Sequence, residues 1–232
     1  MVHDQQFPGP HGRNAPRYAP AGARRSRHPC LKCYGWFCCG LFALALIFAA
    51  VVAGFWAIVN PSLPKYTVFG ITSNAYNFTN DFKFHGRFVV NLGSNNLNKY
   101  ITIVYEKDST VDLLFRDGRS NFVKLCSGMF PEFKQPTANI TSMNIDLKGD
   151  LTKGDFGGSA NTFNEKVKSN SIPLVVAVKT HGEAIILGHN LKVELAANCS
   201  MDVDSLSAGK EGKEQLKMSN MICEGTNVKY FI

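Results

Sequence analysis

The chain has 232 residues, a formal net charge of +7 and 45% hydrophobic residues. The positive charge is local, because residues 1–32 hold six of the 25 Lys and Arg residues but only one of the 18 Asp and Glu residues. The rest of the chain is nearly neutral, so the net charge does not indicate a nucleic-acid-binding protein. The hydrophobic content is enough to build a core, which excludes a chain that is disordered throughout.

Residues 1–35 are expected to form a disordered, basic arm. Residues 1–29 hold half of the ten prolines of the chain and almost no aliphatic side chains. Such a segment buries too little apolar surface to offset the entropy lost on ordering. The arginines near its end should be attracted to anionic lipid headgroups.

A membrane-spanning helix is predicted over residues 36–59. No Asp, Glu, Lys, Arg or His occurs between Cys33 and Pro64, and 12 of the 24 residues from Trp36 to Val59 are Leu, Ile, Phe or Val. A helix of this length measures about 36 Å, enough to cross a hydrocarbon core of about 30 Å. The apolar run is longer and begins later than that of a cleaved signal peptide, which favours a retained signal-anchor. The lipid bilayer is therefore an expected partner.

The orientation of this helix follows from the charges that flank it. Arg24, Arg25, Arg27 and Lys32 precede the helix, whereas a single Lys65 follows it closely. The positive-inside rule then places residues 1–35 in the cytoplasm and residues 60–232 in the lumen or outside the cell.

Cysteines gather at the cytoplasmic end of the predicted helix. Juxtamembrane thiols are sites of reversible S-acylation, which we expect here, with unmodified helix-end cysteines as the alternative. A zinc site is not expected, because no second ligand pair stands at the usual spacing. The four candidate lipidation sites are Cys30, Cys33, Cys38 and Cys39.

Small residues recur at every fourth position of the predicted helix. Such a stripe allows two helices to approach closely, so a helix–helix homo-oligomer is a candidate, although alanine is also common filler in membrane helices. The stripe consists of Ala45, Ala49, Ala53 and Ala57.

Residues 60–204 are expected to form one all-β domain, a fibronectin- or immunoglobulin-like antiparallel β-sandwich with one or two short helices. Residues 101–106, 111–116 and 174–178 alternate apolar and polar side chains with period two, and a long run follows from 184 to 197. Asp117-Gly118 indicates a hairpin turn, and His181-Gly182 is interpreted as another turn. Helices are predicted only at 162–169 and 207–218, and residues 205–232 are interpreted as a C-terminal extension.

Three N-glycosylation sequons and three cysteines lie after the predicted helix. The sequons begin at Asn77, Asn139 and Asn198, which agrees with a lumenal or extracellular domain. In an oxidising compartment one disulfide and one leftover thiol are expected. The pair Cys199–Cys223 is favoured, with pairing through Cys126 and three buried thiols as the alternatives.

No complete catalytic constellation is found, so we do not expect an enzyme, a cofactor or a metal site. Gly157-Gly158-Ser159-Ala160 approaches a nucleophile elbow, but Asn161 stands where the closing glycine is required. Asp155-Phe156-Gly157 spells the metal-binding triplet of kinases without the other parts of that machinery. The sequence points to a membrane-tethered interaction domain or structural domain.

The order of features resembles the plant harpin-induced-like and non-race-specific-disease-resistance-like membrane proteins, whose outer part is a group-two late embryogenesis abundant domain. The resemblance rests on the basic, Cys-rich arm before one span, the exit Asn60–Tyr66, and three degenerate segments, Asn96–Tyr105, Phe130–Thr141 and Ile172–Val176, with the terminal Cys199–Asp204. Leu97 replaces the motif proline, and residues 205–232 extend past the usual end.

This resemblance implies a β-sandwich at the plasma membrane that takes part in plant defence or stress signalling through contacts with unidentified proteins, without catalysis. The alternatives are a structural protein that protects membranes or links wall polymers, and a lipid-binding β-sandwich. Lipid binding requires an apolar pocket, whereas a tightly filled core favours the other two functions.

Overall fold

The computed structural model describes residues 29–79, 81–118, 121–206 and 214–231, with side chains described within these ranges from residue 34 to residue 225. The chain divides into two compact units, residues 1–52 and residues 53–232. Most of the expected basic arm, residues 1–28, lies outside the described residues.

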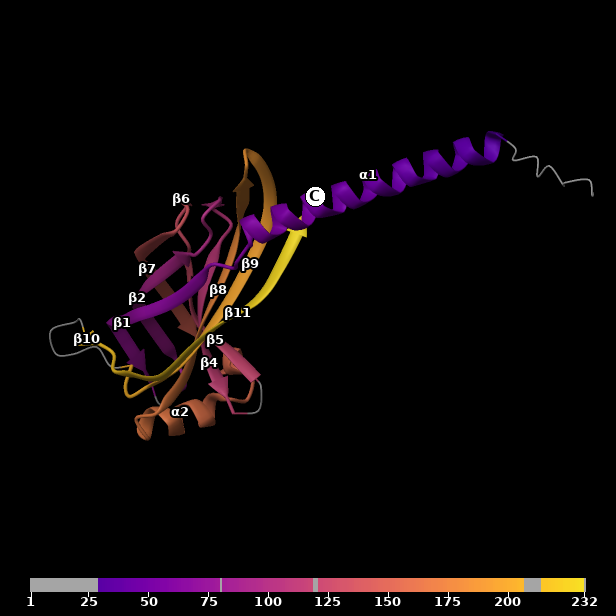
Figure 1. The fold of residues 1–232 in the computed structure, drawn as a ribbon. Coiled ribbons are helices and arrows are strands. Elements are labelled where there is room, and N and C mark those ends of the chain that lie inside the picture. The colour runs from indigo at the N-terminus through magenta and orange to yellow at the C-terminus, as the bar shows by residue number, and fades with distance from the viewer. Residues whose placement is uncertain (1–28, 80, 119–120, 207–213, 232) are drawn as a thin grey trace, which may run out of the picture. The chain divides into compact units, whose positions relative to one another are not determined.

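One long helix, α1 (Pro29–Val59), carries the predicted membrane span (Figure 1). Its part Tyr34–Val59 is long and apolar enough to cross a membrane and is exposed over almost its whole length. The helix ends at Val59 because Asn60 turns into the left-handed region (φ 35°), with its N–H donating to the carbonyl of Trp56, and Pro61 follows. A single apolar helix near the N-terminus is compatible with a membrane anchor. The helix begins within the segment 1–35 that was predicted to be disordered.

The remaining described residues form an antiparallel β domain, which confirms the prediction of an all-β domain after a single apolar helix. Its elements in chain order are β1 (Lys65–Phe78), β2 (Phe84–Asn96), β3 (Ile101–Tyr105), β4 (Thr110–Asp117), β5 (Asn121–Met129), β6 (Phe133–Gln135), β7 (Asn139–Leu151), η1 (Lys153–Phe156), α2 (Ala160–Lys168), β8 (Ile172–Ile186), β9 (His189–Val203), β10 (Glu214–Gln215) and β11 (Met218–Phe231).

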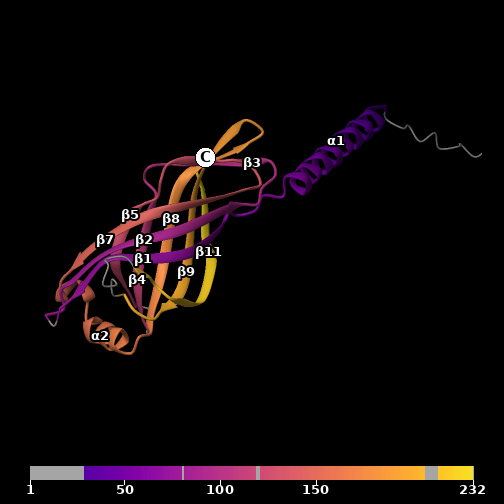
Figure 2. The same ribbon diagram turned by 90° about the vertical axis from the view of Figure 1, so that its left-hand side faces the viewer.

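The strands form one hydrogen-bonded sheet that folds over itself like a sandwich (Figures 1 and 2). One layer contains β1, β2 and β7, and the other contains β5, β4, β8, β9 and β11. The layers join where Ser127 of β5 pairs with Lys148 of β7. Gly149 lies at this junction, where a Cβ atom would collide with the carbonyl of Leu125. A side chain at residue 149 would therefore push the two layers apart.

In the second layer, strand β8 pairs with three other strands, β3, β4 and β9. Strands β3 and β4 follow one another along one edge of β8, and β9 pairs with its other edge from Ile172 to Ile186. The turn predicted at His181-Gly182 is wrong, because β8 continues through both residues. The chain reverses instead at Leu187 and Gly188, which both have positive φ, as a two-residue type I′ turn requires.

The two helix predictions have different outcomes. Helix α2 covers most of the predicted helix at 162–169. The prediction of a helix over 207–218 is wrong for its described part, residues 214–218, which contributes β10 and the start of β11. Leu216 is buried and its N–H donates to the carbonyl of Ile71, so pairing with β1 overrides the local helical preference. The described part of the C-terminal extension is therefore built into the sheet.

Candidate functional site

The strand registers bring several connections to the end of the domain at which β1 begins, here called the entry end. Lys65 pairs with Asn95, Asn96 with Asn139, and Ile101 with Ile186. The entry end therefore contains the peptide 60–64, the connection between β2 and β3, the start of β7 and the β8–β9 turn. It is attached to α1 directly through the chain.

Asn98 fixes the entry peptide to the β domain. The N–H of Ser62 donates to Asn98 Oδ1 at 2.6 Å, and Asn98 Nδ2 donates to the carbonyl of Ser62 at 2.7 Å. Nδ2 also donates to Asn96 Oδ1 at 2.9 Å, so both polar atoms of this buried amide are bonded. Asn98 thus satisfies the backbone of Ser62 much as a neighbouring strand would.

Asn96 organises the loop that presents Asn98. Its Nδ2 donates to the carbonyls of Ile101 and Pro136 at 2.8 and 2.9 Å, while its Oδ1 accepts from the N–H of Asn98 at 3.1 Å. Leu97, between the two asparagines, is exposed. The segment Asn96–Asn98, which carries part of the family resemblance, therefore contains two buried structural amides.

A cluster of buried hydroxyl and amide groups lies deeper in the domain. Tyr105 Oη lies 3.0 Å from Ser94 Oγ and donates to Gln135 Oε1 at 3.1 Å, and Tyr66 Oη lies 3.4 Å from both Tyr105 Oη and Thr180 Oγ1. Burial raises the pKa of Tyr66 well above its usual value, with the nearby Tyr105 adding to the shift, and burial also raises the pKa of Tyr105. Both phenols are therefore neutral and act as hydrogen-bonding groups, not as bases.

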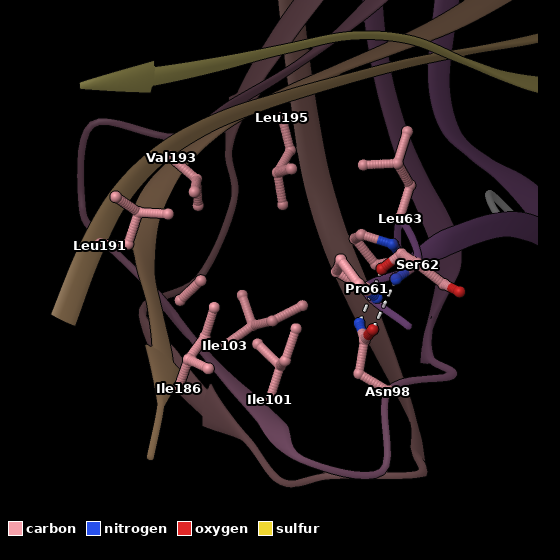
Figure 3. A pocket seen from close by; sticks show the side chains of 12 residues that line it. Pro61, Ser62, Leu63, Asn98, Ile101, Ile103, Ile186, Leu191, Val193 and Leu195 are labelled. Carbon is pink, nitrogen blue, oxygen red and sulfur yellow. Dashed lines mark hydrogen bonds between the residues drawn. The ribbon is translucent and has the colours of Figure 1, made fainter. Parts of the chain in front are cut away.

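An apolar pocket of about 70 Å³ opens at the entry end (Figure 3). Side chains from β3, β8 and β9 form its floor, and the entry peptide forms its opposite wall. Of the lining side chains that the structure describes, only Asn98 and Ser62 carry a polar group. Figure 3 shows the two hydrogen bonds that Asn98 makes to the backbone of Ser62. The lining residues are Pro61, Ser62, Leu63, Pro64, Asn98, Ile101, Ile103, Ala184, Ile186, Leu191, Val193 and Leu195.

A wider groove of about 740 Å³ lies between β1 and β11. Strand β1 pairs with β2 along one edge, but along its other edge only Thr72 and Ser73 pair with β10. Strand β11 pairs with β9 alone within the described residues. Two strand edges without a ladder partner in the described part of the chain therefore border this groove. Its wall includes Leu97 and Met221, which are 44% and 40% exposed.

The three sequon asparagines are all exposed, but their positions in the strands differ. Asn77 lies one residue before the end of β1, and Asn139 is the first residue of β7. Asn198 lies in the middle of β9, between Ala177 of β8 and Glu224 of β11. Occupation of the sequons stays a prediction.

The predicted disulfide Cys199–Cys223 is present and joins directly opposed residues of β9 and β11. Cys126 is a buried free thiol, and burial raises its pKa to about 12, with the charge of Asp150 adding to the shift. Cys38 and Cys39 are exposed on α1. The backbones of Cys30 and Cys33 belong to the first turns of α1, and their side chains lie outside the described part.

The two motifs that resemble catalytic sequences have structural roles. Phe156 is buried, and its ring lies 5.3 Å from that of Phe163 on α2. Asp155 accepts hydrogen bonds from the N–H and hydroxyl of Thr152, which lower the pKa of its carboxyl. Ser159 is buried and donates to Asp117 at 2.7 Å. Among the described residues, no group of three or more His, Cys, Asp and Glu side chains is placed to hold a metal ion.

Sequence reasoning missed the pocket, the groove and the two buried asparagines. The Asn-x-Asn spacing of Asn96 and Asn98 was the available signal for the hydrogen bonds that Asn98 makes to Ser62. The pocket and the groove depend on pairings between strands far apart in the sequence, for which no local signal exists.

The chain matches no protein-family model and no curated protein. Among solved structures, it is similar to a protein from Archaeoglobus fulgidus with 12% sequence identity, over 58% of this chain and 95% of that chain, at a TM-score of 0.28. A likeness at this level carries no argument about fold or function.

Proposed function

We propose that this chain is a membrane-anchored, non-catalytic binding protein of the plasma membrane that takes part in plant defence or stress responses through protein contacts. In this proposal α1 is a signal-anchor with its N-terminus in the cytoplasm, and the β domain binds partners outside the cell. The resemblance to the harpin-induced-like proteins supports the biological setting, and the charges around α1 support the orientation.

The observation that carries the binding function is the groove between β1 and β11. An extended peptide can add a strand to an open sheet edge, with main-chain hydrogen bonds providing affinity and side-chain pockets providing specificity. The groove offers two such edges, and Leu97 and Met221 supply exposed apolar surface on its wall. The disulfide Cys199–Cys223 holds one of these edges in place.

Proximity labelling of the full chain in plant cells tests this function, with the labelling tag at the C-terminus. Met221→Lys places a charge in the groove, and a charge on an exposed edge opposes strand addition. Met129→Lys is the matched control, because Met129 is also exposed but does not line the groove. We expect Met221→Lys, but not Met129→Lys, to deplete a reproducible set of labelled proteins severalfold.

The same set of labelled proteins in the wild type and Met221→Lys would reject the groove as the binding surface. A set no different from that of an unrelated single-span protein would reject binding altogether and favour a passive structural role. A second tag on residues 1–28 would report cytosolic partners.

S-acylation of the cytoplasmic cysteines belongs to this proposal. Cys38 and Cys39 are exposed on α1, and Cys30 and Cys33 precede them by a few residues. Hydroxylamine-sensitive acyl labelling should disappear when all four become Ser. Label that persists in that variant would refute the assignment.

A further inference from the structure

The apolar pocket at the entry end has a floor made from three strands of the same layer. Its lining includes five buried residues: Ile101 and Ile103 of β3, Ala184 of β8, and Val193 and Leu195 of β9. On the opposite side the entry peptide 61–64 and Asn98 line the pocket (Figure 3). The pocket is therefore a small apolar cavity between this sheet face and the entry peptide.

The geometry points to a ligand for this pocket: the end of an acyl chain of a phospholipid in the bilayer that holds α1. This inference rests on the proposed anchoring of α1 in a membrane. It concerns a different site from the groove between β1 and β11, and it stands whether or not that groove binds a protein.

The chemistry of the lining favours a hydrocarbon over a polar ligand. The side-chain amide of Asn98 is already bonded to the backbone of Ser62 and to Asn96. Among the described side chains that line the pocket, the hydroxyl of Ser62 is the only other polar group. Water needs two to four polar partners to occupy a cavity, so the pocket is a poor site for water and a good one for methylene groups.

The position of the pocket in the chain brings it close to the bilayer. Pro61 and Pro64 line the pocket and follow the last residue of α1, Val59, by two and five residues. A fully extended chain spans at most about 3.6 Å per residue, so Pro64 lies within about 18 Å of Val59. The polar layer on each side of a bilayer is about 5 to 8 Å thick, so an anchored chain holds the pocket next to the headgroups.

Charge at the same end suits a phospholipid. Lys65 and Lys99 are exposed and directly follow the lining residues Pro64 and Asn98. Neither lysine takes part in an ion pair among the described residues. Two such ammonium groups are favourable partners for the phosphate of a headgroup whose acyl chain enters the pocket. Leu63, which is 44% exposed, lines both the pocket and the adjoining groove.

Photocrosslinking of the full chain in phosphatidylcholine vesicles tests the inference. One probe lipid carries a diazirine at the end of an acyl chain, and a second carries it on the headgroup. We expect the acyl-end probe, but not the headgroup probe, to label peptides containing residues 184–195, as identified by mass spectrometry. If the acyl-end probe labels only α1 of the wild-type chain, the inference is overturned.

Ala184→Leu provides a second test, because it adds a larger side chain to the pocket floor. Ala177→Leu is the matched control, since Ala177 is on the same strand but does not line the pocket. We expect Ala184→Leu to lower acyl-end labelling of residues 184–195 at least fivefold and Ala177→Leu to leave it unchanged. Equal labelling of the two folded variants would overturn the inference. If Ala184→Leu does not fold, Leu191→Trp serves in its place and is judged in the same way.

Discussion

Asn98 binds both backbone polar groups of Ser62, accepting from its N–H at 2.6 Å and donating to its carbonyl at 2.7 Å. Ser62 lies between the end of α1 and the start of β1. The side chain of one residue therefore fixes the peptide that connects the apolar helix to the β domain. The same peptide is a wall of the apolar pocket.

Asn98→Ala should lower the free energy of unfolding of the β domain by about 2 to 3 kcal/mol, because it removes three hydrogen bonds at a buried position. Urea unfolding of the full chain in detergent, followed by far-UV circular dichroism, measures this change. Asn144→Ala is the control. The Asn144 side chain is exposed and bonds only to Asn91 among the described residues, so its loss should cost less than about 0.5 kcal/mol. An equal loss of unfolding free energy in the two variants would show that the hydrogen bonds between Asn98 and Ser62 do not stabilise the fold.

Tyr105→Phe and Tyr76→Phe should change the free energy of unfolding by clearly different amounts. Tyr105 Oη has three partners, Tyr66, Ser94 and Gln135, so its removal breaks three hydrogen bonds in a buried cluster and should cost about 1 to 3 kcal/mol. Tyr76 Oη is buried and has no hydrogen-bond partner among the described residues. Its removal should therefore be neutral or stabilising by up to about 1 kcal/mol.

Thermal or urea unfolding of both tyrosine variants and the wild type decides this comparison. Each substitution removes one oxygen atom and keeps the ring, so packing changes little. A loss of stability in Tyr76→Phe comparable to that in Tyr105→Phe would contradict the assignment of an unpaired hydroxyl to residue 76.

Alkaline pH should destabilise the β domain through its buried tyrosines. Burial raises the pKa of Tyr76 to about 12 and that of Tyr66 well above the unfolded value of 10. Above pH 10 the unfolded chain loses these phenolic protons while the folded chain keeps them, so folding becomes less favourable as pH rises. The stabilising effect of the bound protons is complete below pH 10 and decreases through the folded pKa values.

The test is the free energy of unfolding between pH 8 and pH 11. The wild type should lose stability more steeply above pH 10 than Tyr66→Phe, which lacks one of the raised pKa values. The comparison of slopes cancels the effect of lysine titration, which both proteins share. Parallel curves for the two proteins would contradict the predicted linkage.

The disulfide Cys199–Cys223 closes a loop with a sequence separation of 24 residues. A loop of this length predicts a stabilisation of about 3.5 kcal/mol in the chain-entropy model. The double variant Cys199→Ser, Cys223→Ser should show this loss in urea unfolding, and non-reducing peptide mapping should find the 199–223 pair in the wild type.

In the folded wild type, Cys126 should resist alkylation at pH 8, because its thiol is buried and its pKa is about 12. A mixed 126–223 pair in the peptide map would contradict both expectations.

The parts of the fold that the sequence predicted are those with a local signal. An uncharged run of 24 residues specified the helix, and period-two alternation at 101–106 and 111–116 specified β3 and β4. The turn at Leu187 was missed because leucine rarely takes positive φ, and only pairing of β8 with β9 places it there. The segment 214–216 was misassigned because its partner, β1, lies some 140 residues earlier.

Among the candidate sites, too, the one with a local sequence signal was predicted, and those that depend on distant contacts were not. The disulfide could be predicted because few cysteines follow the helix, so the choice was small. The clasp between Asn98 and Ser62 joins residues 36 apart, and the pocket combines residues 61–64 with 101–103 and 184–195. Such contacts depend on strand order, which alternation alone does not fix.

The three sequons should be glycosylated to different extents. Asn77 and Asn139 lie at or next to strand ends, whereas both neighbouring strands pair with β9 around Asn198. The middle residue of the third sequon, Cys199, is also held in a disulfide. The backbone of the last sequon is therefore fixed in the sheet once β9 and β11 have paired, although the Asn198 side chain is exposed, and its occupancy should be the lowest of the three.

Single Asn→Gln variants, with glycosidase-sensitive gel mobility as the measurement, give the occupancy of each sequon in a plant expression host. Cys223→Ser leaves the sequon of Asn198 unchanged but frees Cys199, so it should raise occupancy at Asn198 and leave Asn77 and Asn139 unchanged. Full occupancy of Asn198 in the wild type would contradict the idea that pairing of β9 with β11 limits access. Glycan at any of the three would place the β domain on the lumenal side, whereas a glycan-free chain in a competent host would contradict the orientation inferred from the charges around α1.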